Sequence, residues 1–216
     1  MSYCRVKMKR EASNLYKYPI NLIKDHTMQT NILWTGCEYH SLENCLINES
    51  KSGTEISSTI IGHYEDKIYK VEYHIITNNH WETVFFKIVC QHSNQQLTIS
   101  YESDGKGNWA NAGKPLGLFN SCIDIDIRLT PFTNTLPIRR LQLQPGDSRE
   151  IQVLYFDLPE GQITPVRQRY TCISATEYHY QNIPNDFEAT ILVDKSGFVV
   201  DYPTLFVRTA AQESYF

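Results

Sequence analysis

The sequence predicts a mainly β protein whose short strands form a large antiparallel sheet, arranged as a roll, a barrel or a sandwich. Apolar residues recur with a period of two along many segments, and these segments are rich in β-branched and aromatic residues, which fit a pleated, half-buried surface. No segment between them is long enough for repeated helical crossovers. The pattern implies about ten or more strands. The clearest strand segments are 60–61, 68–75, 83–88, 97–101, 123–129, 151–156, 169–173, 189–193 and 198–202.

The breaks between these segments contain residues that favour turns. Gly and Asn accept a positive φ, and Pro presets the entry to a turn. Gly105-Lys106-Gly107 lacks the long glycine loop and the Lys-Ser/Thr ending of a phosphate-binding loop, so it predicts a hairpin turn. The turn segments are 78–79, 105–108, 145–147, 184–186 and 194–197.

Composition excludes several broad classes. The 216 residues are 41% hydrophobic and 20% charged, which suits a folded protein with one large domain or two small ones. The net charge of −4 gives no general reason to bind nucleic acid. No run of 18 apolar residues exists, so we expect a chain that does not span a membrane.

The N-terminal segment 1–28 differs from the rest of the chain. It has six basic and two acidic residues, so its charge is +4 and that of the remaining 188 residues is −8. Three interpretations stay open: an extension upstream of a natural start at Met28, a basic arm for an anionic surface, or a loosely ordered tail. We expect an extension at 1–28, a β domain at 29–210 and a C-terminal tail at 211–216. Because no signal peptide is evident and Cys4 follows no apolar run, we expect a cytoplasmic location.

The cysteines and histidines give no pattern of a metal centre. The six cysteines include no CxxC pair, and the seven histidines include no pair at i and i+4 with a Glu between them. Most cysteines lie in or beside apolar strand segments, where free Cys behaves as a small apolar residue. We therefore expect reduced, mostly buried cysteines, no metal and no cofactor.

The segment 122–141 has the most unusual chemistry. Asp124 and Asp126 alternate with isoleucines, which places both carboxylates on one side of a strand at a spacing of about 7 Å. They could form a solvated or Arg-paired face, or a general acid and base. Further on, Thr133 or Thr135 could cap a short helix over 134–141 with Pro137 in its first turn.

Aromatic residues are numerous, with 14 Tyr, 9 Phe and 3 Trp. Most of those in strands should fill the core. Because buried Tyr and Trp need hydrogen-bond partners, the same residues also suit the wall of a partly polar cavity, where flat rings stack on sugars or line a lipid tunnel. Those in or beside strands are Trp34, Tyr73, Trp81, Trp109, Tyr155, Tyr170, Tyr178, Tyr180, Tyr202 and Phe206.

The run Thr-Pro-Phe-Thr-Asn-Thr-Leu-Pro-Ile-Arg-Arg-Leu at 130–141 resembles the signature of the bacterial putative glycolipid-binding family, a former domain of unknown function. The resemblance covers about residues 31–208. Further matching positions, in the family's order, are Trp34 with Gly36 and Glu38, Tyr73 with 81–83, 104–109, 122–126, 168–171, 193–194 with Gly197, and 201–206.

The resemblance implies a spiral β-roll, in which a long antiparallel sheet wraps around a single short helix and forms a funnel-like pocket. It also implies a likeness in shape to lipoproteins that carry glycolipids. The helix at 134–141 would be the wrapped helix. Its Arg139 or Arg140 would then be enclosed and would need Asp124 or Asp126 as a partner.

Three functions follow from these observations. The first is non-enzymatic binding of a lipid or glycolipid-like amphiphile, a small partner, with no nucleic acid involved and no catalytic residues. The second is an enzyme on a small anionic substrate, with Asp124 or Asp126 as base and Arg139 or Arg140 as anion clamp. The third is a structural protein with no ligand. The candidate ligand-binding residues are Arg139, Arg140, Asp124, Asp126, Asn134, Trp81, Trp109, Tyr73, Tyr170 and Tyr178.

Overall fold

The computed structural model describes residues 26–184 and 186–216, and within them fifteen strands form a single sheet. Its order is β8-β7-β6-β5-β4-β3-β2-β1-β15-β14-β13-β12-β11-β10-β9. Neighbouring strands are antiparallel, except that β9 and β10 are parallel. The strands are β1 (His26–Gly36), β2 (Ser41–Ser50), β3 (Gly53–Tyr64), β4 (Lys67–Asn78), β5 (Thr83–His92), β6 (Gln95–Ser103), β7 (Trp109–Asn111), β8 (Lys114–Pro115), β9 (Asp124–Ile127), β10 (Ser148–Asp157), β11 (Gln162–Ser174), β12 (Glu177–Ile183), β13 (Glu188–Val193), β14 (Val199–Tyr202) and β15 (Phe206–Tyr215). The predicted mainly β fold is confirmed.

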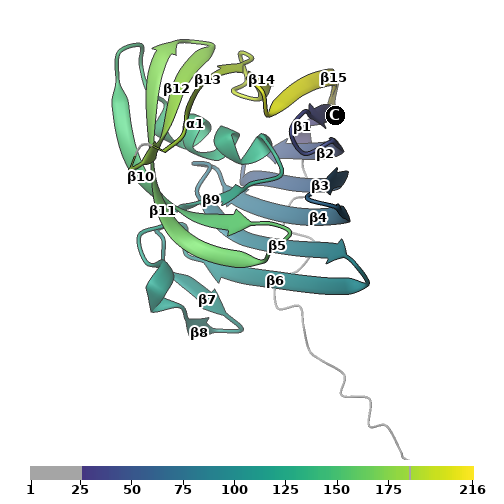
Figure 1. Cartoon of the computed structure of the whole chain (residues 1–216). Coiled ribbons are helices and arrows are strands. Elements are labelled where there is room, and N and C mark those ends of the chain that lie inside the picture. Colours follow the sequence, from purple (N-terminus) through teal and green to yellow (C-terminus); the bar gives the residue numbers. More distant parts are fainter. Residues whose placement is uncertain (1–25, 185) are drawn as a thin grey trace, which may run out of the picture.

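The sheet consists of two meanders joined by the first and last strands. The first runs from β1 to β8 and the second from β10 to β15, and β1 pairs with β15 along most of its length. The sheet curves around the short helix α1 (Thr135–Leu141), with β10–β12 on one side of the helix and β1–β5 on the other (Figure 1). This curvature places the core between the helix and the inner face of the sheet.

Strand β4 shows why these residues form a half-buried sheet. Tyr69, Val71, Tyr73 and Ile75 are buried, and the polar residues between them face outward. Successive side chains of a strand point to opposite faces, so the period-two pattern of the sequence becomes one apolar face and one polar face. The inward residues join one continuous apolar cluster with Phe132, Leu136 and Ile138.

The predicted helix at 134–141 is confirmed, preceded by one 3₁₀ turn at Phe132–Asn134. Pro137 lies in the first turn, where a missing N–H costs little. The helix ends at Leu141, and the C-cap residue Gln142 has a left-handed φ of 49°. The predicted threonine cap is wrong, because Asn134 occupies the N-cap position and its side chain makes no capping bond, while Thr133 bonds to β9.

The two ends of the described chain pair with each other. Most of the basic segment 1–28 lies outside the described residues, and β1 begins at His26. At the other end, residues 211–215, expected as a tail, form the end of β15, where Tyr215 pairs with Met28 of β1. No helix among the described residues is long and apolar enough to cross a membrane.

The described cysteines are free thiols. Cys45, Cys90, Cys122 and Cys172 are buried, as predicted, and Cys37 is exposed. Burial raises the pKa of the Cys90 and Cys122 thiols to about 11, so both are inert at neutral pH. Within residues 26–184 and 186–216, no group of three His, Cys, Asp or Glu side chains is placed to hold a metal ion.

Candidate ligand-binding site

A cavity of about 280 Å³ lies where β9, β10, β12, β14 and β15 approach one another. The remaining wall comes from the β1–β2 loop, the turn after β9, the 3₁₀ turn before α1, and the β12–β13 and β14–β15 connections. Six of its residues are aromatic, two carry a carboxylate and one carries a guanidinium. The lining residues are Glu38, Tyr39, Asp126, Ile127, Arg128, Thr130, Asn134, Tyr155, Tyr180, Asn182, Phe187, Tyr202, Leu205 and Phe206. We call this space the aromatic cavity.

The rings form a connected wall. Tyr202 is central, with its ring centroid 6.2 Å from those of Tyr180 and Phe187 and 6.3 Å from that of Phe206. Phe206 in turn lies 5.4 Å from Tyr39. Tilted and edge-on contacts of this kind hold each ring in place. The wall is therefore a fixed, amphipathic surface.

Asp126 is a half-buried carboxylate in the wall of the aromatic cavity. The strand alternation of β9 turns it to the same side as Asp124, away from Ile127. Its carboxylate accepts bonds from Gln168 Nε2 at 2.6 Å and from Thr133 Oγ1 at 3.1 Å. Among the described residues it forms no ion pair. Burial raises the pKa of Asp126, although these two hydrogen bonds oppose the shift.

Arg128 is the cationic group of the aromatic cavity, and its charge is already compensated. Its Nη1 lies 2.7 Å from Asp157 Oδ1, and its Nη2 donates to the Tyr64 hydroxyl at 2.9 Å. The guanidinium also lies over the ring of Tyr64, 5.1 Å from the centroid, and over that of Tyr39 at 5.8 Å. These contacts fix Arg128 in the wall.

The predicted pairing of a helix arginine with a β9 carboxylate is present. Arg140 Nη2 lies 2.6 Å from Asp124 Oδ2, and Arg140 Nε lies 3.1 Å from Oδ1, so the contact is two-pronged. Asp124 is fully buried. Burial raises its pKa, and the guanidinium opposes the shift. The pair fastens α1 to β9, and Asp124 does not line the aromatic cavity.

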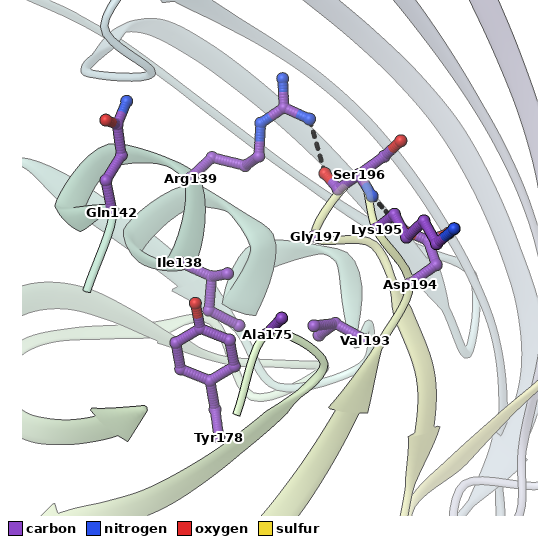
Figure 2. A pocket seen from close by; sticks show the side chains of 10 residues that line it. All are labelled: Ile138, Arg139, Gln142, Ala175, Tyr178, Val193, Asp194, Lys195, Ser196 and Gly197. Atoms are coloured by element: carbon purple, nitrogen blue, oxygen red, sulfur yellow. Dashed lines mark hydrogen bonds between the residues drawn. The ribbon is translucent and has the colours of Figure 1, made fainter. Parts of the chain in front are cut away.

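Arg139 and Tyr178 belong to a second, smaller cavity of about 220 Å³, between α1 and the turn that follows β13. Figure 2 shows Arg139 reaching from the helix to the Ser196 carbonyl oxygen, 2.5 Å away. Arg139 also pairs with Glu49 at 2.9 Å and lies 4.4 Å from the ring centroid of Trp81. The guanidinium is thus held on three sides by protein groups.

The other predicted residues have structural partners. The Tyr170 hydroxyl donates to Asn134 Oδ1 at 2.9 Å, and Asn134 is the second predicted residue, after Asp126, that lines the aromatic cavity. Tyr73 donates to the buried Glu43 at 2.6 Å. Trp109 donates to the Cys122 carbonyl oxygen at 2.7 Å and packs in the core.

Most of the cavity lining was not among the predicted site residues. Tyr155, Tyr180, Tyr202 and Phe206 stood out in the sequence only as aromatic residues of strands. Alternation shows that such residues share a face, but it does not show which faces meet in space. The other lining residues that were missed lie in loops or near strand ends, where no sequence pattern marked them: Glu38, Asn182 and Phe187.

A long curved sheet that wraps around α1 and borders an aromatic-lined cavity defines a β-roll protein. More particularly, the chain belongs to the putative glycolipid-binding family, which matches residues 31–208.

The solved structures include two similar proteins. A DUF1089 family protein from Pseudomonas aeruginosa, known from a crystal structure, is 32% identical, with 77% of this chain and 91% of that chain covered and a TM-score of 0.69. A β-barrel-like protein of the domain of unknown function DUF1849 from Brucella abortus is 6% identical, with 88% and 98% covered and a TM-score of 0.46. No curated protein matches the chain.

Proposed function

We propose that the protein binds a lipid or glycolipid-like amphiphile without chemical conversion, and that the polar head of this ligand occupies the aromatic cavity. One observation carries the proposal: the cavity combines a continuous wall of aromatic rings with a carboxylate, Asp126, that has only neutral partners. Apolar walls with a few convergent polar groups are typical of small-molecule sites. The description of the family agrees with such a ligand.

The size of the cavity supports a head group rather than a whole lipid. At about 280 Å³ it lies just below the usual range for small-molecule pockets, which begins at about 300 Å³. A long acyl chain would extend beyond it. The exposed Phe187 and the half-buried Leu205 give the lining an apolar rim where such a chain can begin.

The geometry favours binding over the alternative of an enzyme for an anionic substrate. A pair of carboxylates acting as acid and base needs both groups at the substrate. Asp124 is enclosed by Arg140, so only Asp126 reaches the cavity. The proposed anion clamp is also engaged, because Arg139 pairs with Glu49 and Arg140 with Asp124.

Extraction of the purified protein tests the proposal. We expect an organic extract to contain an amphiphile by mass spectrometry, and one or more lipids of a panel to raise the melting temperature. Leu205→Trp, which fills the cavity, should lower both signals. Leu118→Trp, at a side chain that is 79% exposed, should leave them unchanged. An empty extract together with no thermal shift for any lipid contradicts the proposal.

A further inference from the structure

We propose that the head group bound in the aromatic cavity carries an ammonium group, with Asp126 as its counter-ion. This inference rests on the proposed function and adds the charge and chemical class of the ligand. Two kinds of head group share this chemistry: an amino sugar, and an ethanolamine attached to a phosphate.

The Asp126 carboxylate has hydrogen-bond acceptor positions that the described residues leave unused. A carboxylate offers about four acceptor positions. Thr133 occupies one on Oδ1 and Gln168 one on Oδ2, and both donors are neutral. No Lys, Arg or His of the described residues lies within ion-pair distance of Asp126. A half-buried carboxylate that only neutral groups contact gains from pairing with a cation. A ligand ammonium would donate to the remaining acceptor positions and supply the missing charge.

The side chains that line the aromatic cavity carry more negative than positive charge. Glu38 and Asp126 are acidic, and Arg128 is the basic side chain of the wall. The Asp157 carboxylate, 2.7 Å from Arg128, cancels that positive charge. The cavity therefore presents a net negative field, which repels an isolated phosphate or carboxylate and attracts a cation.

The aromatic rings of the wall also favour an ammonium group. Ammonium groups are attracted to the faces of Tyr and Phe rings within about 6 Å of the centroid. Six such rings line the cavity, and among the described residues no hydrogen bond involves the hydroxyls of Tyr155 and Tyr202. These two oxygens are available to accept N–H bonds from the ligand. An aromatic wall beside a carboxylate is thus complementary to an ammonium ion in both of its features.

Two pairs of eight-carbon probes, each used below its micelle concentration, test the inference by isothermal titration calorimetry. The first pair is octyl glucoside and octyl 2-amino-2-deoxyglucoside. The second is octyl phosphate and octyl phosphoethanolamine. Within at least one pair, the amine should bind about tenfold more tightly than its partner. The pair with the larger difference identifies the source of the ammonium group.

Variants separate this site from general attraction to an acidic protein. Asp126→Asn should abolish the preference for the amine, and Glu150→Gln, at an exposed carboxylate outside the cavity, should keep it. If Asp126→Asn does not fold, the ranking of the probes on the unaltered protein still decides the matter. Equal or tighter binding of octyl glucoside and octyl phosphate overturns the inference alone. No binding of any probe counts against the proposed function as well.

Discussion

Replacing Glu43 by Gln should stabilise the protein at alkaline pH. Glu43 is 2% exposed; its Oε1 accepts bonds from Ser58 at 2.7 Å and Tyr73 at 2.6 Å, and its Oε2 has no hydrogen-bond partner among the described residues. Burial raises the pKa of this carboxyl from 4.5 to about 7. At about 1.4 kcal/mol for each pH unit, ionising Glu43 in the folded state costs about 3 kcal/mol.

The sign follows from the direction of the shift. Below pH 4.5 the group is protonated in both the folded and the unfolded state, so it costs nothing. Between pH 4.5 and about 7 the unfolded chain releases its proton first, and stability falls as the pH rises. Gln keeps a neutral acceptor for Ser58 and Tyr73 and cannot ionise. The variant should therefore gain up to about 3 kcal/mol over the parent at pH 8 and far less at pH 5.

Urea denaturation of the parent and Glu43→Gln at pH 5 and pH 8 measures this difference. Comparing the two proteins at each pH cancels the titration of other groups. Glu65→Gln, at an exposed position that forms no salt bridge among the described residues, shows what an amide substitution does outside the core. A stability difference between the parent and Glu43→Gln that is the same at both pH values would show that ionisation of Glu43 does not destabilise the folded state.

Two other changes test the attachment of the helix and one tight turn. Arg140→Ala leaves the buried Asp124 carboxylate without its cation and should cost about 3–5 kcal/mol of unfolding free energy by denaturant titration; a loss under 1 kcal/mol would contradict the role given to this pair. Gly107→Ala places a Cβ 2.9 Å from Ser121 Cα at a φ of +84°, so it should lower the melting temperature. Gly113→Ala, at a φ of +77° with open space around it, should lower it less, and equal effects would show that the contact does not matter.

Strand β4 was predictable because its inward residues are apolar and its outward residues are polar. Strand β2 was not, because Ser41 and Glu43 point inward while Leu42, 53% exposed, points outward. Because polar residues occupy inward positions in β2 and an apolar residue an outward one, its sequence lacks the usual apolar–polar alternation. Backbone pairing with β1 and β3 holds the strand in place. Strand β15 is mostly exposed beyond Phe206, so its position also depends on backbone pairing, with β1, rather than on an apolar pattern.

One part of the candidate site was predictable from the sequence and another part was not. The Arg140–Asp124 pair was predictable because a short connection joins β9 to α1 and leaves few partners within reach. The aromatic cavity was not, because Tyr39, Asp126, Tyr155, Tyr180 and Tyr202 come from distant parts of the chain. Only the closing of the second meander against β1 brings these residues together.

A crystal structure of the protein grown with the tighter-binding of the two amine probes, octyl 2-amino-2-deoxyglucoside or octyl phosphoethanolamine, locates the head group. We expect it among Tyr180, Tyr202 and Phe206, with its nitrogen within hydrogen-bond distance of the Asp126 carboxylate. A head group bound in the smaller cavity beside Arg139, or anywhere else outside the aromatic cavity, would contradict this placement.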